Sequence, residues 1–153
     1  MILDAMFKFA TTAQALSGTS DVASTNVHDA GSAKLLFGGF SQRPPLLMII
    51  AEWQSGTSAT IRGRLVGADD AVLTTNPVVI ADTGVILVAD DGTAFASGHA
   101  VAARQLAARG QRTAKRYYGV MWTQGGSSPV FNVKAFIVAD PQTKDLVAKA
   151  AVP

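Results

Sequence analysis

The clearest pattern along the chain is a stretch near its C-terminal end in which bulky residues occupy both alternating positions. In "YYGVMWTQGGSSPVFNVKAFIV", residues 117–138, apolar-rich runs lie on either side of a Gly-Gly-Ser-Ser sequence. Because successive side chains of a strand leave opposite faces of a sheet, a strand with one wet face should alternate apolar and polar residues. This stretch does not alternate. It therefore predicts a β-hairpin that is covered on both faces.

A second strand pair is predicted in the middle of the chain. The run "LLMIIAEWQ", residues 46–54, is apolar on both faces until Glu52, as a buried central strand would be. After "SGTS", the run "ATIRGRLVG" alternates cleanly. It places Ala59, Ile61, Gly63 and Leu65 on one face and Thr60, Arg62, Arg64 and Val66 on the other. These two runs predict another hairpin.

The remaining turn signals divide the chain into further short strands. A first strand is expected at Val22–His28, and "VVIA" and "VILVA" are separated by the hairpin-sized "DTG". Residues 100–110 fit a helix with a C-terminal glycine or, equally, a strand. Seven or eight strands with turns about every 8–12 residues indicate a sandwich or closed barrel. We expect one all-β domain, an antiparallel β-sandwich over residues 21–153, preceded by an N-terminal arm at residues 1–20.

Composition adds the expectation of a partner. The chain has 153 residues, of which 48% are hydrophobic and 16% charged, against roughly 25% charged in an average globular domain. Low charge suggests surface that is buried against something else.

The chain has no cysteine, which excludes disulfides, thiolate metal sites and cysteine nucleophiles. The longest apolar run is far shorter than the roughly 20 residues of a spanning helix, and no signal peptide is recognisable, so no membrane association is expected.

Candidate chemistry is sparse, and neither an enzyme nor a cofactor nor a metal is expected. His28 and His99 are far apart in sequence, and "GGSSP" lacks the strand-turn-helix context of a hydrolase nucleophile. The basic segment 104–116 has no acid within it, but the net charge of +2 is too small to indicate a specific nucleic-acid partner. Trp53 and Trp122, if exposed, could stack on sugars. The alternative function is therefore a carbohydrate-binding jelly-roll module, on a virion or secreted.

Three segments carry a resemblance to a known family. "DAMFKFATTAQALSGT", "ASTNVHDAG" and "RYYGVMWTQGGSSPVFNVKAFIVAD" resemble the capsid cement (decoration) proteins of short-tailed bacteriophages. The resemblance runs over most of the chain and is weakest at residues 67–110. It implies a jelly-roll domain, made in the bacterial cytoplasm, on the outer surface of an icosahedral capsid. There it would bridge copies of the major capsid protein and self-associate, with a dimer favoured and a trimer left open.

Within that hypothesis two groups of residues are candidates for contact with partner chains. The first is the apolar part of the arm, Ile2, Leu3, Phe7 and Phe9. The second is the pair Arg62 and Arg64, which share one strand face and could pair with acidic residues of the shell. The competing interpretation is that the arm covers its own sandwich and that the two arginines are solvated.

Overall fold

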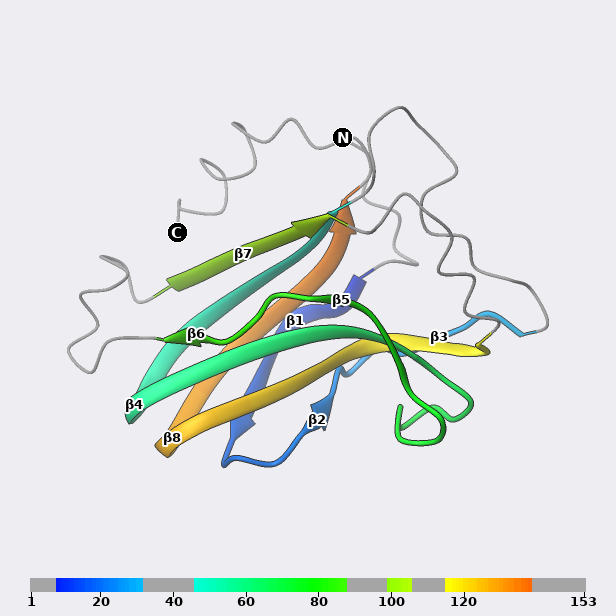
Figure 1. The fold of residues 1–153 in the computed structure, drawn as a ribbon. Coiled ribbons are helices and arrows are strands. Elements are labelled where there is room, and N and C mark those ends of the chain that lie inside the picture. Colours follow the sequence, from blue (N-terminus) through cyan, green and yellow to red (C-terminus); the bar gives the residue numbers. More distant parts are fainter. Residues whose placement is uncertain (1–7, 32–45, 88–98, 106–114, 139–153) are drawn as a thin grey trace.

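All regular secondary structure in the described part of the chain is β-strand. The computed structural model describes residues 8–31, 46–87, 99–105 and 115–138 (Figure 1), and these contain no helix. In chain order the strands are β1 (Lys8–Ser17), β2 (Val22–Ala23), β3 (His28–Asp29), β4 (Leu46–Ala68), β5 (Val78–Asp82), β6 (Ile86–Leu87), β7 (His99–Gln105) and β8 (Tyr117–Val138). Within these residues no helix is long and apolar enough to cross a membrane.

Two very long strands, β4 and β8, organise the sheet. They pair antiparallel along their whole lengths, from Leu46 opposite Val138 to Ala68 opposite Tyr117. Both strands bend at the same place, where the register shifts between Trp53 and Thr60. The other strands add to this bent ribbon on either side, and all pairing is antiparallel. The result is a single curled sheet, a half-barrel.

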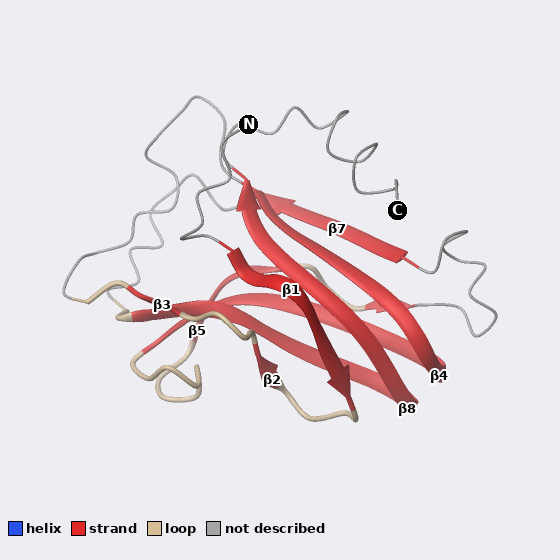
Figure 2. Cartoon of the chain, turned by 180° about the vertical axis from the view of Figure 1, so that it is seen from behind, coloured by secondary structure: helices blue, strands red, loops and turns tan. Residues whose placement is uncertain are grey.

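The bend divides the sheet into two halves that face each other, which we call layer A and layer B. In layer A the order is β1, β8 after the bend, β4 before the bend, and β7. In layer B the two central strands continue, flanked by β2 and β3 on the β8 side and by β5 and β6 on the β4 side. Figure 2 shows the same curl from behind, with β1 and β2 on the side opposite β7.

The main hydrophobic core lies between the layers. Layer A contributes Ile49, Phe131 and Val133, and layer B contributes Ile61 and Trp122, all fully buried in one cluster. The close approach of the layers shows at Gly63, where an added Cβ would lie 3.1 Å from the side chain of Ile49. Inward positions on both central strands are therefore apolar because each layer buries its face against the other.

A second, smaller cluster covers the outer face of layer B. Leu73, from the loop between β4 and β5, packs with Val66, Ala68 and Met121, and Tyr117 borders them. The first half of β8 is thus buried on both faces, with Val120 and Trp122 inward and Met121 outward. The double covering that the sequence predicted for this half is confirmed, and the chain itself provides the cover.

The shared bend is made by residues that the sequence suggested were hairpin turns. Gly56 and Ser58 on β4, and Gly126 and Ser128 on β8, all have positive φ. Thr57 lies opposite Ser127, so the two bends stack on each other within one ladder. Glycine is needed at Gly126, where an added Cβ would lie 2.6 Å from the carbonyl oxygen of Ser58.

The hairpins expected at three turn-forming sequences are wrong for the same reason. The sequences "SGTS", "GGSS" and "DTG" do not close hairpins, because β4 pairs with β8 instead of folding on itself and both β5 and β6 pair with β4. Residues 99–105 form a strand and no helix, while residues 106–110 lie outside the described residues. The expected strand at Val22–His28 is present as the two short strands β2 and β3.

The predicted arm also differs from the structure. Residues 8–17 form β1, which pairs with β8, and Phe9 and Leu16 belong to the main core. The few large apolar residues of this segment are sufficient because β8 supplies the hydrogen-bonding ladder. Residues 1–7 lie outside the described residues. The expected all-β, antiparallel architecture is confirmed.

Candidate partner-binding face

The alternation of β4 places Arg62 and Arg64 on the outer face of layer B. Ile61, Gly63 and Leu65 face the core, so Arg62 and Arg64, which alternate with them, point away from it. Arg62 lies opposite Thr123 of β8, and Arg64 lies opposite Asp82 of β5. Three neighbouring strands therefore supply polar groups to one strip of the sheet surface.

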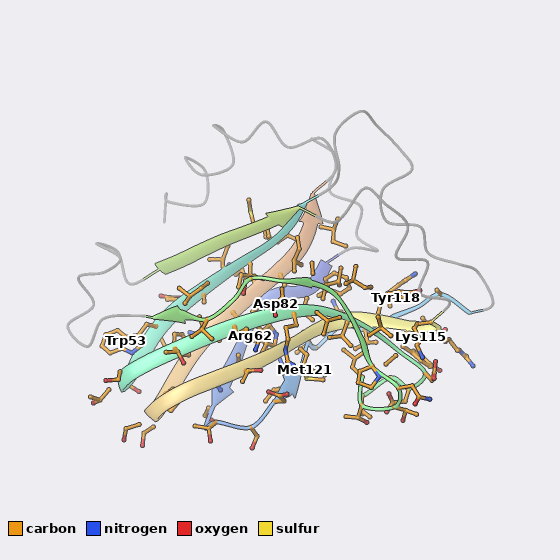
Figure 3. All side chains as sticks on the ribbon, in the orientation of Figure 1. Trp53, Arg62, Asp82, Lys115, Tyr118 and Met121 are labelled. Atoms are coloured by element: carbon orange, nitrogen blue, oxygen red, sulfur yellow. The ribbon has the colours of Figure 1, made fainter. Side chains whose placement is uncertain are left out.

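Arg62 forms a bidentate ion pair with Asp82. Its Nε atom donates to both carboxylate oxygens at 2.9 and 3.1 Å, and its Nη2 atom also donates to Oδ2. The backbone N–H of Gly84 donates to the same carboxylate at 2.8 Å. The pair therefore connects the central strand β4 to the turn between β5 and β6. Figure 3 shows Arg62 and Asp82 side by side, away from the bend.

Arg64 belongs to a second network on the other side of the strip. Its Nη2 atom donates to Asp21 Oδ2 at 2.7 Å and to Thr123 Oγ1 at 2.8 Å. The Thr123 hydroxyl in turn donates to Asp21 Oδ1 at 2.6 Å. This network holds the β1–β2 loop, which carries Asp21, against the two central strands.

The two arginines shift the titration of their partners. The pKa of Asp82 lies below its ordinary value, chiefly because Arg62 donates hydrogen bonds to the carboxylate. The pKa of Asp21 is also lowered, first by the Thr123 hydroxyl and then by Arg64. Both carboxylates are therefore ionised at neutral pH, and the two positive and two negative charges of these pairs balance each other.

Three exposed apolar side chains lie in β5 and in the loops on either side of it, next to this strip. Among the described residues the exposed large hydrophobics are Val72 (62%), Val79 (41%) and Val85 (67%). Val79 lies opposite Val66, on the outer side of β5, while Val85 lies in the β5–β6 turn and Val72 in the loop that precedes β5. We call this surface the β5 face; it comprises Asp21, Arg62, Arg64, Val72, Val79, Asp82, Val85 and Thr123. Exposed apolar groups beside paired charges on a rigid sheet are suited to contact with another protein.

The contact residues predicted from the sequence fall in different places. Arg62 and Arg64 share a face as expected, but each is already engaged by an aspartate of its own chain. Phe9 is buried in the main core, so its side chain is not available on the surface. Ile2, Leu3 and Phe7 lie outside the described residues. Asp21, Asp82 and the three valines were not identified from the sequence, because their proximity depends on the pairing of distant strands.

The last two cations of the basic segment, directly before β8, are also paired. Lys115 donates to both oxygens of Asp69 at 3.0 Å. Arg116 donates to Asp29 at 2.9 and 3.0 Å and lies 5.0 Å from the ring centre of Tyr117. These two cations therefore fasten loops to the sheet, which leaves little charge at this position for phosphate groups.

The groups considered for sugar binding or catalysis lie in separate parts of the described sheet. Trp122 is fully buried, and Trp53 is partly buried against the core near the bend (Figure 3). His28 pairs in register with β8 in layer B, whereas His99 lies opposite Glu52 in layer A. The described residues contain no group of three or more histidines and acids that could hold a metal ion.

Comparisons with known proteins give no family and no relative from which a function could be inferred. No protein-family model and no curated protein matches this chain.

Proposed function

We propose that the protein is a capsid cement protein, which binds the outside of an icosahedral phage shell and stabilises it by bridging major capsid protein subunits. The proposal joins the resemblance of three sequence segments to the surface described above. Residues 24–31 and 116–138, which carry much of that resemblance, supply β3 and β8 of the curled sheet.

The observation that supports the proposal best is the β5 face. It combines three exposed valines with two ion-paired arginines on a surface braced by β4 and β8. Such a surface can bury apolar area while its charges meet complementary charges of a partner. Because Arg62 and Arg64 are already paired, the partner that fits is one with mixed charge. A purely acidic partner would have to displace both aspartates.

The finer architecture belongs to the same proposal. We propose that the curled sheet is the body of a jelly-roll sandwich, in which layers A and B are the two packed sheets. A rigid sandwich is suited to bridging because it transmits load between two contact points without unfolding locally. Each bound copy stabilises the form of the shell to which it binds. The binding free energies of many copies add up, so modest contacts give a large total stabilisation.

The alternative of sugar binding has less support. It requires an exposed aromatic side chain beside polar groups, and Trp122 cannot provide one because it is fully buried. Of the two tryptophans considered for this role, Trp53 is left, and it packs against the core.

The test is co-sedimentation with shells of the major capsid protein encoded in the same genome, in compact and expanded forms. We expect saturable binding to expanded shells. Val79→Asp should weaken it by roughly tenfold or more, about 1.4 kcal/mol. The matched control is Ser127→Asp, which adds the same charge at the bend, far from the β5 face, and should bind as the unmodified protein does. Absence of saturable binding of the unmodified protein to either form would overturn the proposal.

A further inference from the structure

The strand at the outer edge of layer A is long and regular. β7 pairs with β4 over seven consecutive residues, from Leu46 opposite Gln105 to Glu52 opposite His99, with no shift in register. Within the described residues β4 is its single partner strand. Every second residue of such a strand directs its backbone N–H and C=O groups away from the sheet, where they can pair with another strand.

The other described edges are interrupted. The ladder of β1 has two register shifts, and Gln14 in this strand bonds to Ala23 and Thr25 of the neighbouring segment. β5 has a register shift and follows Pro77 directly. β2, β3 and β6 have two residues each, and β5 approaches β7 without pairing with it. Register shifts, prolines and short strands are the usual protections of a sheet edge, and β7 has none of them.

We propose that β7 pairs antiparallel with β7 of a second copy of this chain, about a two-fold axis at Ala102. In this register the sequence "HAVAARQ" is complementary to itself. Arg104, the one charged residue of the strand at neutral pH, lies opposite Ala100 of the second copy and not opposite the same arginine. His99 lies opposite Gln105, and Val101 lies opposite Ala103. No like charges are opposed, and small or apolar residues occupy the centre.

The pairing would join the two A layers into one continuous sheet across the dimer. An antiparallel edge pair is an isologous contact, so it closes at two copies and forms no fibre. It uses layer A only and leaves the β5 face of layer B to other contacts. The inference does not rest on the cement function, although a dimer would present two β5 faces to a shell and so gain avidity.

The first test is the mass of the purified protein by light scattering, from a few micromolar to a few hundred micromolar. Twice the mass of one chain is expected at the upper end. A single-chain mass throughout this range would overturn the proposal.

The second test fixes the register by cysteine cross-linking, which is unambiguous because the chain has no cysteine of its own. Ala102→Cys should form a disulfide dimer on mild oxidation, because opposed residues of an antiparallel pair have Cα atoms about 4.5–5.5 Å apart. Ala100→Cys alone should not, because its two copies would be offset by four residues, about 13 Å. Mixing Ala100→Cys with Arg104→Cys should restore the cross-link.

Thr19→Cys in the exposed β1–β2 loop is the control for random collision and should remain reduced. A dimer in which Ala102→Cys cross-links no faster than Thr19→Cys would show that another surface makes the contact. Equal cross-linking of Ala100→Cys alone and in the mixture would likewise contradict the register.

Discussion

Leu73 is the side chain through which the loop between β4 and β5 is fixed to the outer face of layer B. It is almost completely buried and has a positive φ of 61°, and Asp70 holds the backbone beyond it through the N–H groups of Thr74 and Thr75. Gly119 of β8 forms the socket, since a Cβ there would lie 2.8 Å from Leu73 Cδ1. The fit of one leucine onto one glycine therefore determines how this loop sits.

This fit can be measured with a double-mutant cycle. Gly119→Ala should lower the free energy of unfolding by about 1–3 kcal/mol, because the added methyl group overpacks the socket. Leu73→Ala should cost about 2–4 kcal/mol through lost burial. The double variant should lose clearly less than the sum, because shortening Leu73 makes room for the new methyl group. Additive losses in chemical denaturation would show that the two residues do not meet.

The ion pairs of the β5 face make a separate prediction about acid. Asp21 and Asp82 have pKa values below the ordinary 3.8, so their pairs stabilise the folded state above that pH, and the stabilisation is lost as pH falls through the lowered values. Asp82→Asn should therefore be less stable near neutral pH, although only slightly, because water screens so exposed a pair. Its stability should decline less steeply than that of the unmodified protein below pH 3.8.

The measurement is urea unfolding at a series of pH values, with Asp70→Asn as a comparison outside the β5 face. Asp70 also has a lowered pKa, chiefly through the backbone N–H of Thr75. Parallel curves for Asp82→Asn and the unmodified protein down to the lowest pH would contradict a role for the Arg62–Asp82 pair in stability.

At the scale of elements, the bend shared by β4 and β8 turns a flat ribbon into a curled sheet. Each strand changes direction through two residues with positive φ, and the two bends lie against each other in the ladder. Because the bends coincide, the strands stay paired on both sides of them, and layers A and B close over one core. A fault in either bend should therefore weaken the whole sheet.

Replacing a glycine of the bend has two costs, the unfavourable backbone conformation and the steric overlap of the new Cβ. Comparing Gly126→Ala in the bend with Gly18→Ala outside it separates the two. Both glycines have positive φ, but an added Cβ at Gly18 meets no atom within 4 Å, whereas at Gly126 it meets backbone atoms at 2.6–2.9 Å. Gly18→Ala should cost about 1 kcal/mol of stability for the backbone conformation alone. Gly126→Ala should cost about 3 kcal/mol, because steric overlap is added. Equal losses in thermal unfolding would show that the bend tolerates a side chain.

The same bend explains which parts of the fold could be predicted from sequence. The alternation of Ile61, Arg62, Gly63 and Arg64 correctly assigned the faces of β4, and the apolar run from Leu47 to Ala51 correctly indicated a central strand. Strand pairing was predicted wrongly, because the turn-forming residues at the bends are equally suited to hairpins. Whether such residues form a hairpin turn or a bend within one long strand depends on the long-range pairing of β4 with β8, which the local sequence does not encode.

The candidate face shows the same limit. Its arginines could be predicted because they are two residues apart on one strand. Asp21 and Asp82 come from a loop and a strand that reach Arg64 and Arg62 only after the sheet has formed. The valines of the β5 face could not be identified from the sequence for another reason. Single exposed apolar residues are common, and they become informative only when several share one surface.

For the whole molecule, we propose a function by contact, in which the bound protein stabilises a shell. The described sheet has a hydrophobic core of its own, and the exposed large hydrophobics among the described residues lie in or next to the strands that carry the ion pairs. Stabilisation of a shell would then arise by mass action from binding to one state of that shell.

The most direct test is the temperature at which expanded shells of the major capsid protein from the same genome disrupt, measured by light scattering with and without saturating protein. We expect a higher disruption temperature with the unmodified protein and a smaller rise with Val79→Asp at equal concentration. Compact shells should show little change in either case. An unchanged disruption temperature of expanded shells at saturating protein would contradict the account.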